Sequence, residues 1–189
     1  MASLSVAIDF VLKQEDALMS GDVTTLRGDS GGATRFGIAS AYHPELMASG
    51  YFDSDRVSRE SALAIAVQLY NTAYAEPLRI TSIQDQAVAT AVLSFGVNAG
   101  VPEAGKQLQE ACVASGKPVT VDHIVGYGTL AAVNALDPNY LLAQFCDKVR
   151  TFYTDLATSN PNDAGDLDGW LNRVSAWQAN AALLRSLAA

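Results

Sequence analysis

A glutamate lies on an apolar stripe near the N-terminus. Residues 4–19 carry apolar side chains at helical spacing, and Glu15 falls in the middle of their stripe. The residues three and four positions away are Val11, Leu12, Leu18 and Met19. Because a buried carboxyl group tends to keep its proton, Glu15 is a candidate general acid. In the alternative, Glu15 lies at the edge of the core and pairs with Arg27 or Arg35.

A glycine-rich loop downstream holds a second carboxylate. In "GDSGGATRFG", residues 28–37, Asp29 precedes two glycines and Thr34 follows them. Glycines let the backbone approach a ligand closely. A buried acid with an ionised aspartate and a hydroxyl is a workable set for glycoside hydrolysis. One group protonates the leaving oxygen, and the other activates water or stabilises the transition state. The alternative for Asp29 is the commoner role of a turn-forming aspartate.

The same loop contains "GDSGG", the pattern around the nucleophilic serine of trypsin-like proteases. That fold is all-β, whereas this chain has mostly helical periodicity. Ser30 also precedes both histidines, His43 and His123, and each of these falls in an expected loop. We therefore reject a serine nucleophile. A phosphate-binding loop is rejected too, because no lysine precedes the threonine in "GDSGGATR".

The composition narrows the class of protein. The 189 residues suit one ordinary domain or two small ones, and 49% are hydrophobic. A net charge of −8 with scattered Lys and Arg argues against nucleic-acid binding. Cys112 and Cys146 fit no metal-binding spacing and are expected to be reduced core residues, with a disulfide only in an oxidising compartment. We see no signal peptide and no membrane-spanning run, so we expect a soluble cytoplasmic product without membrane insertion.

Helices must position these side chains. Helical patterns cover residues 4–19, 58–75, 82–99, 102–116, 137–157 and 167–187. Ser58 and Asp137 are expected N-caps. Between the first two helices the periodicity is lost, and β-branched and aromatic residues flank the glycines, which predicts a small β-hairpin near 24–38. The fold class is therefore mainly α with a small β-hairpin.

These residues, in this order, resemble glycoside hydrolase family 108, the N-acetylmuramidases of phage endolysins. The family's loop reads Asp-Pro-Gly-Gly-Ala-Thr-x-x-Gly-Ile, and "DSGGATRFGI" differs from it only by Ser30 in place of proline. "VQLYNTAYAEPLR" and "AVLSFGVNAG" are similar to later family segments. "GYGTLAAVNALDPNYLLAQFCDKVRTFYTDLA" and "GWLNRV" resemble its C-terminal peptidoglycan-binding half. The resemblance covers most of residues 5–175.

The resemblance implies a lysozyme-like helical fold with a catalytic part at 1–100 and a peptidoglycan-binding-like part at 101–189, packed into one compact unit. It implies cleavage of the β-1,4 bond between N-acetylmuramic acid and N-acetylglucosamine. Glu15 is then the acid, with Asp29 and Thr34 as partners, and no metal or other cofactor is needed. The alternatives are a lytic transglycosylase, or a non-catalytic wall-binding or virion structural protein.

Four further residues are predicted to bind substrate: Phe36, Tyr70, Tyr74 and Asn98. Tyr70 and Tyr74 lie one helical turn apart and could stack on sugar faces, although an aromatic pair at this spacing is more often part of the core. Phe36 is expected to line the cleft beside the hairpin. Asn98 either binds an N-acetyl group in the cleft or bonds to carbonyls at the end of its helix.

The chain departs from the family at "EDA", where Glu-Gly-Gly is expected, and in a longer connection to Asp29. An extra helical turn through Met19 would absorb the added residues, and Asp22 is a fallback second carboxylate. As an endolysin, the protein would be a monomer that waits in the host cytoplasm and reaches the periplasmic wall through a holin.

Overall fold

The computed structural model describes residues 1–25, 32–160 and 164–188. Within these residues the chain is mainly helical, with one three-stranded antiparallel sheet whose strands lie in the order of the sequence. The predicted fold class, mainly α with a small hairpin, is confirmed. None of the described helices is long and apolar enough to cross a membrane.

The contacts divide the chain into two units, which we describe separately. The N-terminal unit is Ile8–Asn71, and the C-terminal unit is Met1–Ala7 with Thr72–Ala189. Helix α4 (Gln86–Ala99) belongs to the C-terminal unit because it packs against four helices that follow it in the chain. These are α5 (Val101–Ala114), α7 (Pro138–Ser159), α8 (Leu167–Ala179) and α9 (Ala181–Leu187).

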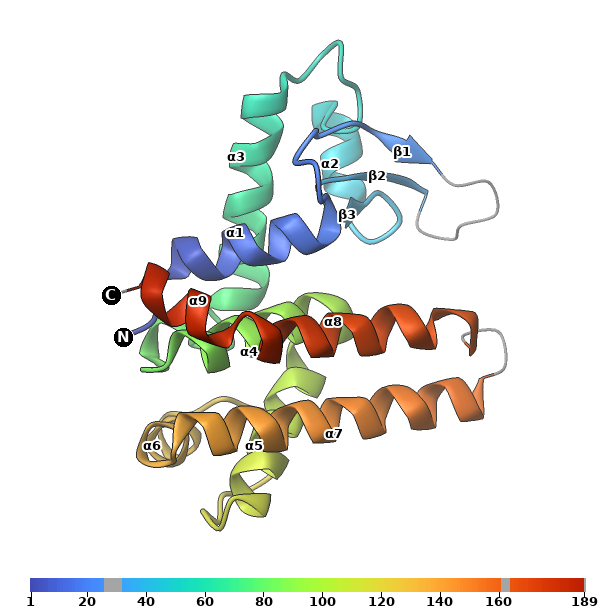
Figure 1. Cartoon of the computed structure of the whole chain (residues 1–189). Helices are drawn as coiled ribbons and strands as arrows, with labels where there is room; N and C mark the ends of the chain where they lie inside the picture. The colour runs from blue at the N-terminus through green and yellow to red at the C-terminus, as the bar shows by residue number, and fades with distance from the viewer. Residues whose placement is uncertain (26–31, 161–163, 189) are drawn as a thin grey trace. The chain divides into compact units, whose positions relative to one another are not determined.

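The N-terminal unit holds the sheet and three helical segments (Figure 1). These are α1 (Leu4–Glu15, from Ile8 onward), β1 (Thr24–Thr25), β2 (Ala33–Arg35), β3 (Ile38–Ala39), α2 (Pro44–Ser49) and α3 (Arg59–Leu69). Ser58 caps α3 as predicted, since its side chain accepts a hydrogen bond from the Ser61 amide. A π-helical segment, η1 (Tyr70–Ala75), continues α3.

Helix α1 ends at Glu15, four residues earlier than predicted. The Asp16 carboxylate accepts a hydrogen bond from the Gly21 amide at 2.8 Å, and the Asp16 carbonyl accepts one from the Met19 amide at 2.9 Å. These bonds fold the next residues into a turn, so the expected extra helical turn through Met19 is wrong. Leu18, predicted to lie on the buried stripe, is 88% exposed.

The sheet contains the predicted hairpin and one more strand. β1 pairs with β2 through Thr24↔Thr34 and Thr25↔Ala33. β2 pairs with β3 through Arg35↔Ile38, which leaves a two-residue turn of Phe36 and Gly37. Their φ values of +49° and +76° are both positive, as in the type I′ turns that join twisted strands. Positive φ is easy for glycine and strained for phenylalanine, so the surrounding structure must hold Phe36 there.

A buried arginine joins the sheet to the loop before α3. Arg35 is 2% exposed and donates hydrogen bonds to the carbonyls of Gly21 (2.7 Å), Tyr51 (2.9 Å) and Val57 (3.0 Å). The Tyr51 hydroxyl returns a bond to the Arg35 carbonyl at 3.1 Å. Burial raises the pKa of the Tyr51 phenol, and the positive charge of Arg35 opposes this shift. Arg35 thus satisfies backbone carbonyls of two segments that have little regular structure.

The C-terminal unit is a helical bundle around α4. Every residue of α4 from Gln86 to Gly96 is buried. Helices α5 (Val101–Ala114), α7 (Pro138–Ser159), α8 (Leu167–Ala179) and α9 (Ala181–Leu187) pack on α4, as does the 3₁₀ turn η2 (Ile80–Ser82). Helix α6 (Tyr127–Ala135) packs on α5 and α7, and the 3₁₀ turn η3 (Ala164–Asp166) packs on α7 and α8. α7 and α8 run side by side in Figure 1. Asp137 caps α7 as predicted, accepting bonds from the Asn139 and Tyr140 amides.

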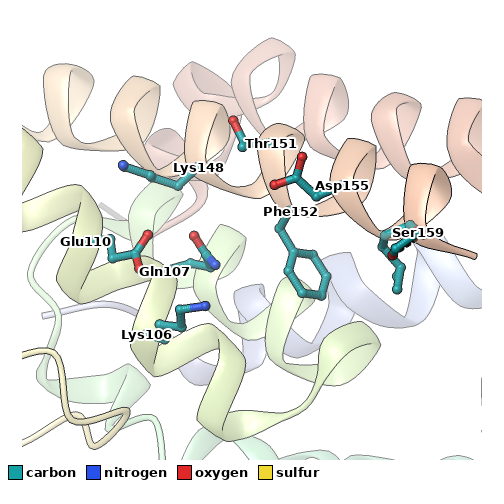
Figure 2. Close-up of a pocket in the computed structure, with 9 residues that line it drawn as sticks. Lys106, Gln107, Glu110, Lys148, Thr151, Phe152, Asp155 and Ser159 are labelled. Atoms are coloured by element: carbon teal, nitrogen blue, oxygen red, sulfur yellow. Dashed lines mark hydrogen bonds between the residues drawn. The ribbon is translucent and has the colours of Figure 1, made fainter.

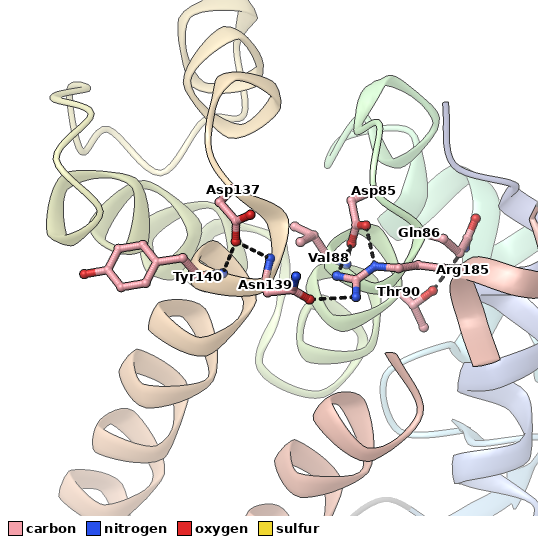
Figure 3. A network of polar contacts seen from close by, with 8 residues as sticks. All are labelled: Asp85, Gln86, Val88, Thr90, Asp137, Asn139, Tyr140 and Arg185. Atoms are coloured by element: carbon pink, nitrogen blue, oxygen red, sulfur yellow. Dashed lines mark hydrogen bonds and ion pairs between the residues drawn. The ribbon is translucent and has the colours of Figure 1, made fainter. Parts of the chain in front are cut away.

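An ion pair fastens the last helix to the start of α4 (Figure 3). Arg185 on α9 donates from Nε to Asp85 Oδ2 at 2.6 Å and from Nη2 to Oδ1 at 3.2 Å. Its Nη1 also donates to Asn139 Oδ1 at 2.8 Å. Asp85 is at the same time the N-cap of α4, because Oδ1 accepts the Val88 amide at 3.0 Å. One carboxylate therefore serves both helix capping and interhelical pairing.

Candidate active site

Glu15 lies at the C-terminal end of α1, half-buried against the turn between β2 and β3. The backbone of this turn meets the stem of the glutamate. A Cβ atom built on Gly37 would lie 2.6 Å from Glu15 Cβ and 2.7 Å from Glu15 Cγ. Such distances are too short for any side chain, so only glycine permits this approach. The turn thereby limits the directions in which the Glu15 carboxyl group can extend.

Tyr70, directly after the end of α3, contacts the same turn. Its hydroxyl donates a hydrogen bond to the Phe36 carbonyl at 2.9 Å. It also lies 2.7 Å from the position that a Cβ on Gly37 would take. Tyr70 is the first residue of η1, and π-helical segments are rare and frequent at functional sites. The turn is thus enclosed by Glu15 and Tyr70 within one unit.

Two of the aromatic residues predicted to bind substrate, Phe36 and Tyr70, are packed inside the protein. Phe36 is 2% exposed and Tyr70 is 1% exposed. A Cβ on Gly21 would lie 2.5 Å from the Phe36 ring, so the ring closely covers that glycine. Phe36 and Tyr70 therefore support the turn beside Glu15, and the structure presents neither ring as an open stacking surface.

The two predicted partners of Glu15, Asp29 and Thr34, both belong to the glycine-rich segment 28–37. Thr34 is half-buried in β2, opposite Thr24. Side chains alternate along a strand, so Thr34 points to the sheet face opposite that of the buried Arg35. Asp29 lies outside the described residues. The fallback Asp22 is exposed in the segment before β1.

Tyr74 and Asn98 belong to the C-terminal unit. Tyr74 is half-buried in η1. Asn98 is exposed near the end of α4, and its Oδ1 accepts a hydrogen bond from the Tyr153 hydroxyl at 2.6 Å. Tyr153 stacks on Trp170 with ring centroids 4.9 Å apart. Trp177 is fully buried, whereas Trp170 is half-buried.

Three residues that organise the site were not singled out from the sequence for that role: Gly37, Arg35 and Arg59. Arg59 donates from Nε and Nη2 to the Met19 carbonyl at 2.9 and 2.6 Å, which secures the connection after Glu15. Only Gly37 had a sequence signal, since it is a fixed glycine in the loop pattern. Within the described residues no group of three or more His, Cys, Asp or Glu could hold a metal ion.

Two family models and one solved structure are similar to this chain. Residues 8–100 match the family described as Glycosyl hydrolase 108, and residues 103–175 match the family described as Predicted Peptidoglycan domain. A solved structure, that of Brucella abortus SagA, shares the fold with a TM-score of 0.69. It is 22% identical, and the match covers 96% of this chain and 95% of SagA. No curated protein matches the chain.

The two matched segments together define a glycoside hydrolase that acts on peptidoglycan. Residues 8–100 thus form a glycoside hydrolase family 108 domain, and residues 103–175 form a peptidoglycan domain, as the sequence motifs predicted.

Proposed function

We propose that this enzyme is an N-acetylmuramidase that cleaves the β-1,4 bond between N-acetylmuramic acid and N-acetylglucosamine. The observation that carries the proposal is the position of Glu15, at the end of α1 with its stem against Gly37. A general acid must be held within hydrogen-bond reach of the oxygen that it protonates. Close packing of its stem provides that positioning.

In the reaction, the Glu15 carboxyl group donates its proton to the glycosidic oxygen as the bond to C1 breaks. Positive charge develops on the sugar ring, and a water molecule supplies the hydroxyl group of the new reducing end. Asp29, with Thr34, is proposed to activate that water or to stabilise the charge. The family resemblance supports these two roles.

A turbidity assay on outer-membrane-stripped cells tests the catalytic role of Glu15. Glu15→Gln keeps the shape of the side chain and removes the acid, so we expect clearing to slow by roughly 10²–10⁴-fold. Glu60→Gln is the matched control, because Glu60 is exposed on α3 in the same unit. The proposal fails if Glu15→Gln clears cells at the rate of the control while both keep the wild-type circular dichroism.

The released fragments identify the bond. Mass spectrometry should find muropeptides with reducing N-acetylmuramic acid ends, which result from attack by water. A lytic transglycosylase would instead release anhydro sugars without net addition of water. Reducing N-acetylglucosamine ends would place the cut at the other glycosidic bond and contradict the proposal.

We further propose that the enzyme is a monomeric phage endolysin with antimicrobial activity, held in the host cytoplasm until a holin gives it access to the wall. The resemblance to phage endolysins supports this role. Expression in a Gram-negative host should cause lysis with a co-expressed holin and little lysis without it. Equal lysis in both cultures would rule out holin dependence. Light scattering that gives the mass of a dimer would contradict the monomer.

A further inference from the structure

The C-terminal unit has an open groove between α5 and α7 that lies apart in sequence from the Glu15 turn. Its volume is about 460 Å³, within the range of roughly 300–1,000 Å³ typical of ligand sites. Figure 2 shows Lys106, Gln107 and Glu110 extending from α5, and Lys148 and Asp155 from α7. We name this feature the α5–α7 groove. It lies entirely within residues 103–175, the segment that matches the peptidoglycan family.

Three charged groups that line the α5–α7 groove have no partner among the residues that the structure describes. Lys148, Glu110 and Asp155 form no ion pair or side-chain hydrogen bond with any other residue that the structure describes. Lys106, in contrast, lies 3.5 Å from Glu103. Lys148 and Glu110 are nevertheless half-buried, so each has lost part of its hydration. A ligand with complementary charges would recover that loss.

The groove also has a rigid apolar portion. Phe152 is half-buried, and its ring packs edge-to-face on Phe95 of α4 at a centroid distance of 5.5 Å. Leu156 lies one turn further along α7 and also lines the groove. Because Phe95 is fully buried, it fixes the position of the Phe152 ring. The ring and Leu156 can therefore contact methyl groups at little cost in side-chain entropy.

We propose that the α5–α7 groove binds the peptide stem of peptidoglycan. The stem carries carboxylates, alanine methyl groups and, where it contains diaminopimelic acid, an ammonium group. Lys148 pairs with a stem carboxylate, and Glu110 and Asp155 face the ammonium group. The glycan strand offers mainly neutral hydroxyl and acetamido groups, which would leave these charges unpaired. This inference rests on peptidoglycan being the substrate, and it does not depend on which glycosidic bond is cut.

Binding is tested with the soluble tripeptide L-alanyl-γ-D-glutamyl-meso-diaminopimelic acid, titrated into the ¹⁵N-labelled full chain. Amide shifts should concentrate on α5 and α7 around the groove. Lys148→Met keeps the aliphatic stem and removes the charge, so we expect binding to weaken roughly tenfold or more. Glu110→Gln should also weaken it, through the ammonium group. Lys117→Met is the matched control, because Lys117 is exposed just beyond α5 and outside the groove.

A second experiment separates this proposal from the role of Glu15. Hydrolysis is compared on intact sacculi and on glycan strands from which an amidase has removed the stems. Wild type and Lys117→Met should prefer intact sacculi, and Lys148→Met should lose much of that preference. Glu15→Gln should be inactive on both substrates and still bind the tripeptide.

Absence of shifts in the groove, or equal tripeptide affinity in wild type and Lys148→Met, would overturn the stem site. An active Glu15→Gln variant would instead overturn the catalytic proposal and leave the stem site standing.

Discussion

Gly37→Ala should damage both stability and catalysis, because the new methyl group has no room. It would lie 2.6 Å from Glu15 Cβ and 2.7 Å from the Tyr70 hydroxyl, on a residue with φ +76°. The left-handed backbone costs alanine about 1–2 kcal/mol, and overpacking adds about 1–3 kcal/mol. We therefore expect the free energy of unfolding to fall by roughly 2–5 kcal/mol. The rate should fall as well, since a catalytic group misplaced by about 1 Å can cost about 10²-fold.

Gly116→Ala is the matched control for backbone strain. Gly116 has φ +81° and nothing within 4 Å of the position of an added Cβ, so its variant should show the backbone cost without the clash. Urea unfolding gives the two losses of stability, and reducing-end release from purified sacculi gives the two rates. If Gly37→Ala loses no more stability than Gly116→Ala and cleaves sacculi at the wild-type rate, the close packing of the turn against Glu15 is refuted.

Three further predictions concern bonds and buried groups elsewhere in the chain. Tyr70→Phe removes the donor to the Phe36 carbonyl, so it should lower the free energy of unfolding by about 1–3 kcal/mol in urea titrations and slow the turnover. Wild-type stability and turnover would contradict a supporting role for this hydrogen bond. Arg185→Met breaks the pairing with Asp85 and should lower the Tm by roughly 2–8 °C without changing kcat, measured by calorimetry and reducing-end release; an unchanged Tm would contradict a stabilising role for the pair. Burial raises the pKa of Cys112 to about 11 and that of Cys146 to about 12, so a thiol reagent at pH 8 should react only after unfolding. Rapid labelling of the native chain would contradict their burial. As the pH rises, these thiols lose their protons at a lower pH in the unfolded chain than in the folded one. The free energy of unfolding should therefore fall as the pH rises past the ordinary thiol pKa of 9.0.

Local patterns were enough to predict most of the regular elements. Ser58 and Asp137 act as the caps that their types and positions suggested, because capping depends on side chains within two or three residues. The hairpin was predictable for a similar reason, since β-branched residues flank a glycine turn. The apolar stripe and the family resemblance both indicate Glu15 as the acid, and that role stays a prediction.

Long-range contacts explain what the sequence did not reveal. α1 stops at Glu15 because Asp16 bonds back onto the following turn, and because Arg59, 40 residues away, binds the Met19 carbonyl. Helical periodicity in the sequence cannot indicate these hydrogen bonds. In the same way, the three carbonyls that Arg35 binds lie 14 to 22 residues away, so its burial follows from tertiary structure. Phe36 was predicted to line a cleft, and its positive φ instead turns the ring onto Gly21.

The central claim is that Glu15 donates a proton to the leaving oxygen, and an activated substrate tests it most directly. A dinitrophenyl glycoside of the cleaved sugar has a leaving group that departs without protonation, whereas the natural strand requires the proton. We predict that Glu15→Gln loses roughly 10²–10⁴-fold in kcat/KM on the natural strand and far less on the dinitrophenyl glycoside. Equal losses on both substrates would mean that Glu15 has a structural role, and would contradict the account.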